Sequence, residues 1–281
     1  GDRYELAGPL PPLAIPSTLH DSLMARLDRL PQLKEVAQLG ACIGREFSHE
    51  LLASVSPIGE QVLVAALQQL HEADLVVRRG TPPAATYTFK HALVQDAAYA
   101  SLLKTTRQHH HAAIAAAMTQ RFAETAETQP EFVAHQFTEA GMLREAIAWW
   151  QKAGKRASQR AAVPECIANY RKGLELVASL PASLERDKAE LSLQVALAFA
   201  LMTGRGWTEP DTIKAIERAA ELGRSLSEAS QSSPELYWSL RAPGTFYSMR
   251  GMHRDAKTIA EQCLRVADQG SGLDLLHLLQ V

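Results

Sequence analysis

The stretch Arg144–Ala153, REAIAWWQKA, decides how most of this chain folds. Within it Ala146, Trp150 and Ala153 are separated by four and then three residues, so they lie on one face of a helix. A small residue lets a neighbouring helix approach closely, and the large residue fills the space beside it. The stretch therefore predicts a helix that is buried among other helices.

The same spacing recurs along the chain, in blocks that begin at Pro164, Pro210 and Arg254. The corresponding triplets are Cys166, Tyr170 and Gly173; Thr212, Ile216 and Ala219; and Ala256, Ala260 and Cys263. The pattern resembles the second helix of a tetratricopeptide repeat, with Ala134 and Phe137 at matching positions of a preceding helix, although the blocks do not recur every 34 or so residues. We therefore predict a tetratricopeptide-repeat-like α-solenoid over residues 106–281, with the last repeat truncated.

Residues 31–90 have a different pattern, which predicts short helices followed by two strands. Short helices are expected over 33–39, 48–55 and 60–73, with Ser48 as an N-cap and with Gly40 and Gly44 as the stop of the first helix. Leu75–Arg79 is β-prone, the following turn holds a glycine and two prolines, and Thr86–Phe89 alternates polar and aromatic side chains. Three helices followed by a hairpin is the order of a winged helix.

The expected fold class is thus mainly α, with a small winged-helix (α+β) domain followed by the solenoid. We expect an extended linker over 1–16, a winged-helix-like domain with flanking helices over 17–105, and repeats over 106–281. Ser17 is the expected N-cap of the first flanking helix. Because Leu273–Val281 begins an apolar helical pattern without a cap, we interpret the chain as a segment of a longer polypeptide.

Composition narrows the classes of partner. Hydrophobic residues make up 46% and charged residues 21% of the 281 residues, which is typical of a globular protein. Lys and Arg number 29 against 31 Asp and Glu, a formal net charge of -2, so no long-range field attracts nucleic acid or anionic lipid. We therefore expect neither nucleic acid nor a membrane as the partner.

The cysteines and the apolar runs point to a cytoplasmic protein. Cys42, Cys166 and Cys263 are far apart and odd in number, so they predict neither a disulfide framework nor a metal site. The longest apolar run, Val195–Met202, is far shorter than the roughly 20 residues that cross a bilayer.

The sequence lacks the patterns that carry catalysis. Gly154-Lys155-Arg156 lacks the upstream glycine of a phosphate-binding loop and lies within a helical pattern. Adjacent helical residues point about 100° apart, so His109-His110-His111 cannot all face one metal ion, and we expect them on a solvated helix surface. No metal, cofactor or catalytic residue is expected in this segment, and we do not expect it to be an enzyme by itself.

Several separated blocks resemble one family. IPSTLHDSLMARLDRLP (15–31), GREF (44–47), YTFKHALVQDAAYASLL (87–103), GRGWTEPDTIKAIERAAEL (204–222) and FYSMRGMHRDAKTIAEQCL (246–264) are similar to the region downstream of the ATPase core in STAND-type bacterial signalling ATPases. These include class III adenylate or guanylate cyclases that carry an AAA-like ATPase and tetratricopeptide repeats. The resemblance implies that the longer protein binds ATP or ADP with Mg²⁺ in an upstream ATPase domain. It also implies an output domain, such as a cyclase, that precedes the ATPase domain in the sequence.

The resemblance also implies one site residue. In related nucleotide switches a histidine near the end of the winged helix contacts the β-phosphate of bound ADP, and Phe89–Leu93, FKHAL, places His91 at that position. Lys90 and Ala92 differ from the residues that usually flank this histidine. An imidazole at a helix start can donate a hydrogen bond to phosphate, but it can equally cap or pack its own helix. The sequence leaves both roles open.

The expected function is therefore that of a non-catalytic regulatory segment. It would couple the nucleotide state of the upstream ATPase domain to a protein, peptide or ligand bound on the repeat surface. The alternative is a DNA-binding winged-helix transcriptional regulator with ligand-sensing repeats. Its reading helix would be Glu60–Ala73, which offers Gln61, Gln68 and Gln69 but no Lys or Arg, and this argues against it.

Overall fold

The computed structural model describes residues 31–227 and, with gaps, residues 239–268. This part is mainly helical and holds one small three-stranded antiparallel sheet, as the fold class requires. The chain divides into two compact units, one up to Ala123 and one from Glu124 onward. The expected linker over 1–16, the helix after Ser17 and the apolar end at 273–281 lie outside the described residues.

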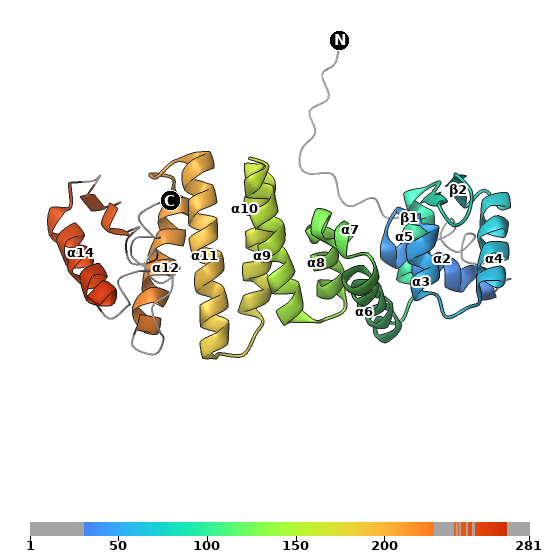
Figure 1. Cartoon of the computed structure of the whole chain (residues 1–281), viewed down its shortest axis with the longest axis horizontal. Helices are drawn as coiled ribbons and strands as arrows, with labels where there is room; N and C mark the ends of the chain where they lie inside the picture. Colours follow the sequence, from blue (N-terminus) through green and yellow to red (C-terminus); the bar gives the residue numbers. More distant parts are fainter. Residues whose placement is uncertain are drawn as a thin grey trace, which may run out of the picture. The chain divides into compact units, whose positions relative to one another are not determined.

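The first unit contains the three expected helices and the expected hairpin (Figure 1). Its elements are α2 (Pro31–Ile43), β1 (Glu46–Ser48), α3 (His49–Val55), α4 (Glu60–Glu72), β2 (Val76–Arg79), β3 (Thr86–Phe89), α5 (Ala92–Ala100) and α6 (Lys104–Arg121). Ser48 caps α3 as predicted, since its side chain accepts a hydrogen bond of 3.2 Å from the Leu51 amide. We grouped α6 with the repeats, but it packs on α2 and α3.

The sheet has the strand order β1-β3-β2. Strand β1 is not among the elements that we expected between the first two helices. Its residue Phe47 pairs with Tyr87 of β3, and the two rings stack with centroids 5.7 Å apart. The apolar side of this sheet forms the core of the unit.

Strand β1 also explains why a glycine stands at position 40. We expected Gly40 to help end the first helix, but it lies inside α2. The helix continues to Ile43, and it is Gly44, with φ of +152°, that follows its end. A Cβ on Gly40 would lie 2.9 Å from the ring of Phe47, so only glycine lets that ring pack on the helix.

The histidine run on α6 does not lie wholly on the solvated surface that we expected. His111 is 1% exposed, and its Nε2 lies 3.0 Å from the hydroxyl of Tyr99 in α5. His110 is half-buried, whereas His109 is exposed. Successive helical residues face different directions, so one of the three faces the core.

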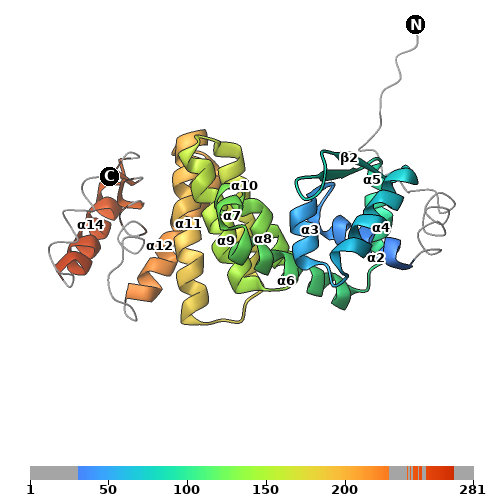
Figure 2. The same ribbon diagram turned by 45° about the vertical axis from the view of Figure 1, so that its right-hand side comes forward.

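The second unit consists of helices that follow one another in space as they do in sequence (Figures 1 and 2). They are α7 (Ala123–Thr128), α8 (Pro130–Glu139), α9 (Leu143–Gln159), α10 (Val163–Ala178), α11 (Leu184–Arg205), α12 (Pro210–Ser227) and α14 (His253–Asp268). From α8 to α12 each helix packs on the next, and α9 also contacts α11. No helix among the described residues has both the length and the apolar character to span a bilayer.

Three of the four small-large-small triplets are buried as predicted. The members of the α9, α10 and α12 triplets are Ala146, Trp150 and Ala153; Cys166, Tyr170 and Gly173; and Thr212, Ile216 and Ala219. The fourth triplet is wrong in register, because Ala260 of α14 is exposed and its neighbour Ile259 is buried.

Candidate functional site

His91 stands immediately before α5, as the N-cap residue of that helix. Its backbone is extended, with φ of -125° and ψ of 137°, and its carbonyl oxygen accepts a 3.1 Å hydrogen bond from the Val94 amide. Its side chain makes no capping hydrogen bond, and the residue is exposed. The imidazole therefore faces solvent at the start of a helix instead of serving its own backbone.

The hairpin register brings a second segment beside His91. Val76 pairs with Phe89, so Asp74 before β2 and Lys90 after β3 lie at the same end of the sheet. The Lys90 ammonium donates a hydrogen bond to the Asp74 carboxylate, and the Lys90 amide donates to the Leu75 carbonyl at 3.1 Å. Asp74 has a left-handed φ of +62°, which turns the chain from α4 into β2.

Basic side chains surround the Asp74 carboxylate at this corner of the first unit. The hydrogen bond from Lys90 lowers the pKa of the Asp74 carboxyl, and the charges of Lys90, His91 and His71 lower it further. His71 is itself fixed, because its Nδ1 donates to the Val76 carbonyl oxygen at 3.1 Å. The His91 ring, in contrast to Lys90 and His71, makes no such bond and faces solvent at the start of α5.

The chemistry available at this corner is anion binding. The first amides of a helix have no partner within the helix, and the macrodipole adds positive potential there. The His91 ring can add an N–H donor to the same ligand. Asp74 engages Lys90, so His91 rather than Lys90 is the donor free to meet a phosphate.

The helix that would read DNA in the alternative function is acidic, with Glu60 and Glu72 at its two ends. Exposed positions of α4 include Gln61, Val62, Val64 and Gln69, and no Lys or Arg stands on this helix. In the hairpin, the Arg78 guanidinium donates to the Gln68 side chain at 3.0 Å. That bond ties the arginine to the protein itself.

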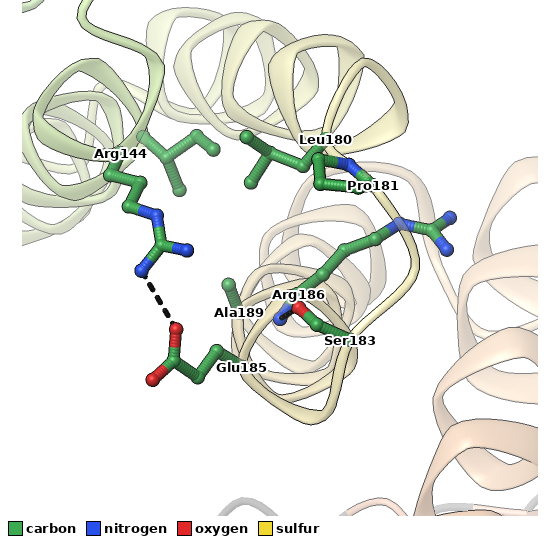
Figure 3. A pocket seen from close by; sticks show the side chains of 8 residues that line it. Arg144, Leu180, Pro181, Ser183, Glu185, Arg186 and Ala189 are labelled. Atoms are coloured by element: carbon green, nitrogen blue, oxygen red, sulfur yellow. Dashed lines mark hydrogen bonds and ion pairs between the residues drawn. The ribbon is translucent and has the colours of Figure 1, made fainter.

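The second unit holds a cavity of about 200 Å³ that the sequence did not reveal (Figure 3). It lies between the start of α9, the end of α10 and the start of α11, and its apolar lining is Ile147, Leu180, Pro181 and Ala189. The Arg144 side chain from α9 reaches across to Glu185 of α11 at 2.7 Å, beside this lining (Figure 3). The residues that line the cavity come from three separate helices, so no local sequence pattern predicts it.

The stretch with some likeness to a phosphate-binding loop lies within a helix. Gly154-Lys155 lies inside α9, where the ring of Tyr170 covers Gly154. In the part of the chain that the structure describes, no three His, Cys, Asp or Glu side chains are grouped to hold a metal ion.

Comparison with known proteins gives one relative. The chain is 27% identical over 266 residues to an uncharacterized protein of Rhizobium meliloti (strain 1021). The alignment covers 94% of this chain but 26% of the relative, so the chain spans about a quarter of the relative's length. No family model and no solved structure matches the chain.

Proposed function

We propose that this chain is a regulatory segment of a STAND-type signalling ATPase. The first unit would act as a winged helix that contacts the nucleotide of an upstream ATPase domain, and the second as a repeat surface for a protein or peptide. The observation that carries the proposal is the exposed His91 ring, which does not cap α5 although it stands at its N-cap.

Three further observations support it. The order α2-β1-α3-α4-β2-β3, with the hairpin strands next to each other in the sheet, is compatible with a winged helix. The relative is about four times as long as the matched stretch, which is compatible with a chain that works beside other domains. The spacing of the buried triplets in α9, α10 and α12 supports a repeat-like packing.

In this proposal the nucleotide and its Mg²⁺ belong to the upstream domain, and they supply the negative charge that the switch detects. This chain supplies a donor at the start of α5, where the helix amides and the His91 ring suit a phosphate. Asp74 positions Lys90 and limits the positive charge at this corner. Partner binding to the repeats shifts the switch only if the two nucleotide states present different contacts to the partner.

The test uses the full-length polypeptide. We expect the wild-type protein to retain ADP through purification and the His91→Ala variant to lose most of it, as measured by chromatography of the released nucleotide. His109→Ala removes an exposed histidine from α6 of the same unit and is the matched control. Equal ADP content in all three proteins would refute the role of His91.

The second candidate is a DNA-binding regulator, favoured by the exposed Gln61 and Gln69 of α4, since glutamine side chains read adenine. It predicts sequence-dependent retardation of duplex DNA by the 281-residue chain, with an affinity that falls steeply with salt. Loss of that retardation in a Gln61→Ala variant would favour this candidate over the nucleotide switch.

A further inference from the structure

One face of α9 carries a row of cations. Lys152, Arg156 and Arg160 follow one another at intervals of four residues, which places them on one side of the helix about 6 Å apart. Trp149 stands one turn before Lys152 on the same side. We call Trp149, Lys152, Arg156 and Arg160 the basic face.

The first cation of the basic face already binds a carboxylate of a helix. The Lys152 ammonium pairs with Glu127 of α7, and it lies 4.3 Å from the centre of the Trp149 ring. The tryptophan thus supports the cation from one side while a glutamate from a neighbouring helix approaches from another.

The next two cations have no such partner. Within the described residues, no carboxylate lies within ion-pair distance of Arg156 or Arg160. Arg156 is half-buried, and its Nε is buried without a hydrogen-bond partner. Arg186 of α11 shows the contrast: its Nε is also buried without a partner, but its terminal nitrogens lie 3.8 Å from Asp187 and Glu190.

The position of Arg156 near the end of α9 does not explain this arrangement. The helix dipole favours a cation in the last turn, but it supplies no carboxylate acceptor for the guanidinium. A carboxylate bound at the terminal nitrogens of Arg156 would give this guanidinium the charged acceptor that it lacks within the described residues.

We propose that the basic face binds an acidic amphipathic helix of a partner protein, with Arg156 as the central contact. Carboxylates four residues apart on such a helix match the spacing of Arg156 and Arg160, and the pair of Lys152 with Glu127 of α7 provides an example of that contact within the chain. The inference rests on the proposed function, because it names the chemistry of the partner on the repeat surface. A nucleic acid suits this face less, since Lys152 is already neutralised and two cations release few counterions.

The experiment uses fluorescence anisotropy with the whole 281-residue chain. The probe is a labelled alanine-based helical peptide with three glutamates at four-residue intervals, and the reference peptide has glutamine at those positions. We expect the chain to prefer the glutamate peptide, and Arg156→Glu to weaken its binding about tenfold. Lys188→Glu, the same charge reversal at an exposed position of α11, should change binding less than about twofold.

Two further variants keep the proposal open to refutation. Arg160→Glu changes an exposed residue, so it tests the face even if a change at the half-buried Arg156 disturbs folding. The double variant R156E/R160E should bind a peptide with lysine in place of glutamate better than the wild type does.

Equal losses in Arg156→Glu, Arg160→Glu and Lys188→Glu would overturn the proposal, because they would show binding by net charge alone. A single-stranded oligonucleotide of equal length that binds more tightly than the glutamate peptide, with the same residue dependence, would overturn it in favour of nucleic acid. Neither result bears on ADP retention by the full-length protein, so the roles of His91 and of the basic face fail separately.

Discussion

The ring of Tyr170 in α10 lies directly against the backbone of Gly154 in α9. A Cβ on Gly154 would lie less than 3.0 Å from three carbon atoms of that ring, a distance that real Cβ atoms do not reach. Glycine is therefore required here by packing between two helices, although in sequence the same residue opens a stretch with some likeness to a phosphate-binding loop. Tyr170 in turn packs in the cluster that joins α9, α10, α11 and α12.

We expect Gly154→Ala to destabilise the second unit by about 1–3 kcal/mol, because the added methyl group displaces the ring or separates the helices. Urea unfolding followed by circular dichroism measures this change. In a Tyr170→Ala background the same substitution should instead be neutral or stabilise by up to about 1 kcal/mol, because alanine favours the helix and no ring opposes it. Additive effects of the two changes would show that Gly154 and Tyr170 do not interact.

Glu190 and Arg218 join α11 to α12 by a two-point ion pair. The Arg218 Nε donates to Oε1 at 2.6 Å and the NH2 group to Oε2 at 3.1 Å, and the Glu190 side chain is 11% exposed. We expect Glu190→Ala to lower the free energy of unfolding by about 1–3 kcal/mol, because the Arg218 guanidinium loses two acceptor oxygens and keeps only Glu221. Glu185→Ala breaks a pair with Arg144 in which both side chains are 73% exposed, and should cost less than about 0.5 kcal/mol.

The half-buried His110 makes the stability of the first unit depend on pH. Burial lowers the pKa of His110 below 6.5, the nearby His109 lowers it further, and Glu35 of α2 opposes the shift. The unfolded chain therefore binds this proton at a higher pH than the folded chain, so stability is lost as the pH falls below about 6.5. We expect the free energy of unfolding of His110→Gln to fall less between pH 7 and pH 5.5 than that of the wild type. A parallel pH profile for the variant would contradict this assignment.

The described thiols should be inert in the folded protein. Cys42 and Cys166 are 3% and 2% exposed, and burial raises the pKa of the Cys166 thiol. Since the thiolate is the reactive form, a Cys263→Ser variant should show no reaction with a disulfide reagent at neutral pH until it is unfolded. Rapid modification of a thiol in the native variant would indicate that the packing of α2 or α10 differs from that described.

Period and spacing in the sequence were enough to predict the helices, the hairpin and the burial of three triplets. These features depend on residues close together in the chain, such as Ala146 and Trp150. Strand β1 was missed because it has only three residues and pairs with β3, as Glu46 does with Thr88. The burial of His111 was missed because it depends on Tyr99 of another helix.

The surroundings of the candidate site could not be predicted from the sequence either, because they depend on contacts between residues far apart in the chain. His91 was named from a resemblance, but its neighbour Asp74 could be placed beside Lys90 only once the register of β2 and β3 was known. The lack of Lys and Arg on α4 was predictable, because it depends on the composition of a single helix. The lack of a hydrogen-bond partner for the buried Nε of Arg156 could not be predicted, since it depends on which side chains pack against the end of α9.

The rate at which ADP leaves the full-length protein tests the central claim most directly. If His91 donates to a phosphate of ADP bound upstream, His91→Ala should release a fluorescent ADP analogue about 10–100 times faster than the wild type, the factor expected for a lost hydrogen bond to a charged group. The control variant His109→Ala should release it at the wild-type rate. Equal rates for His91→Ala and the wild type would contradict the claim that this segment restrains the nucleotide state.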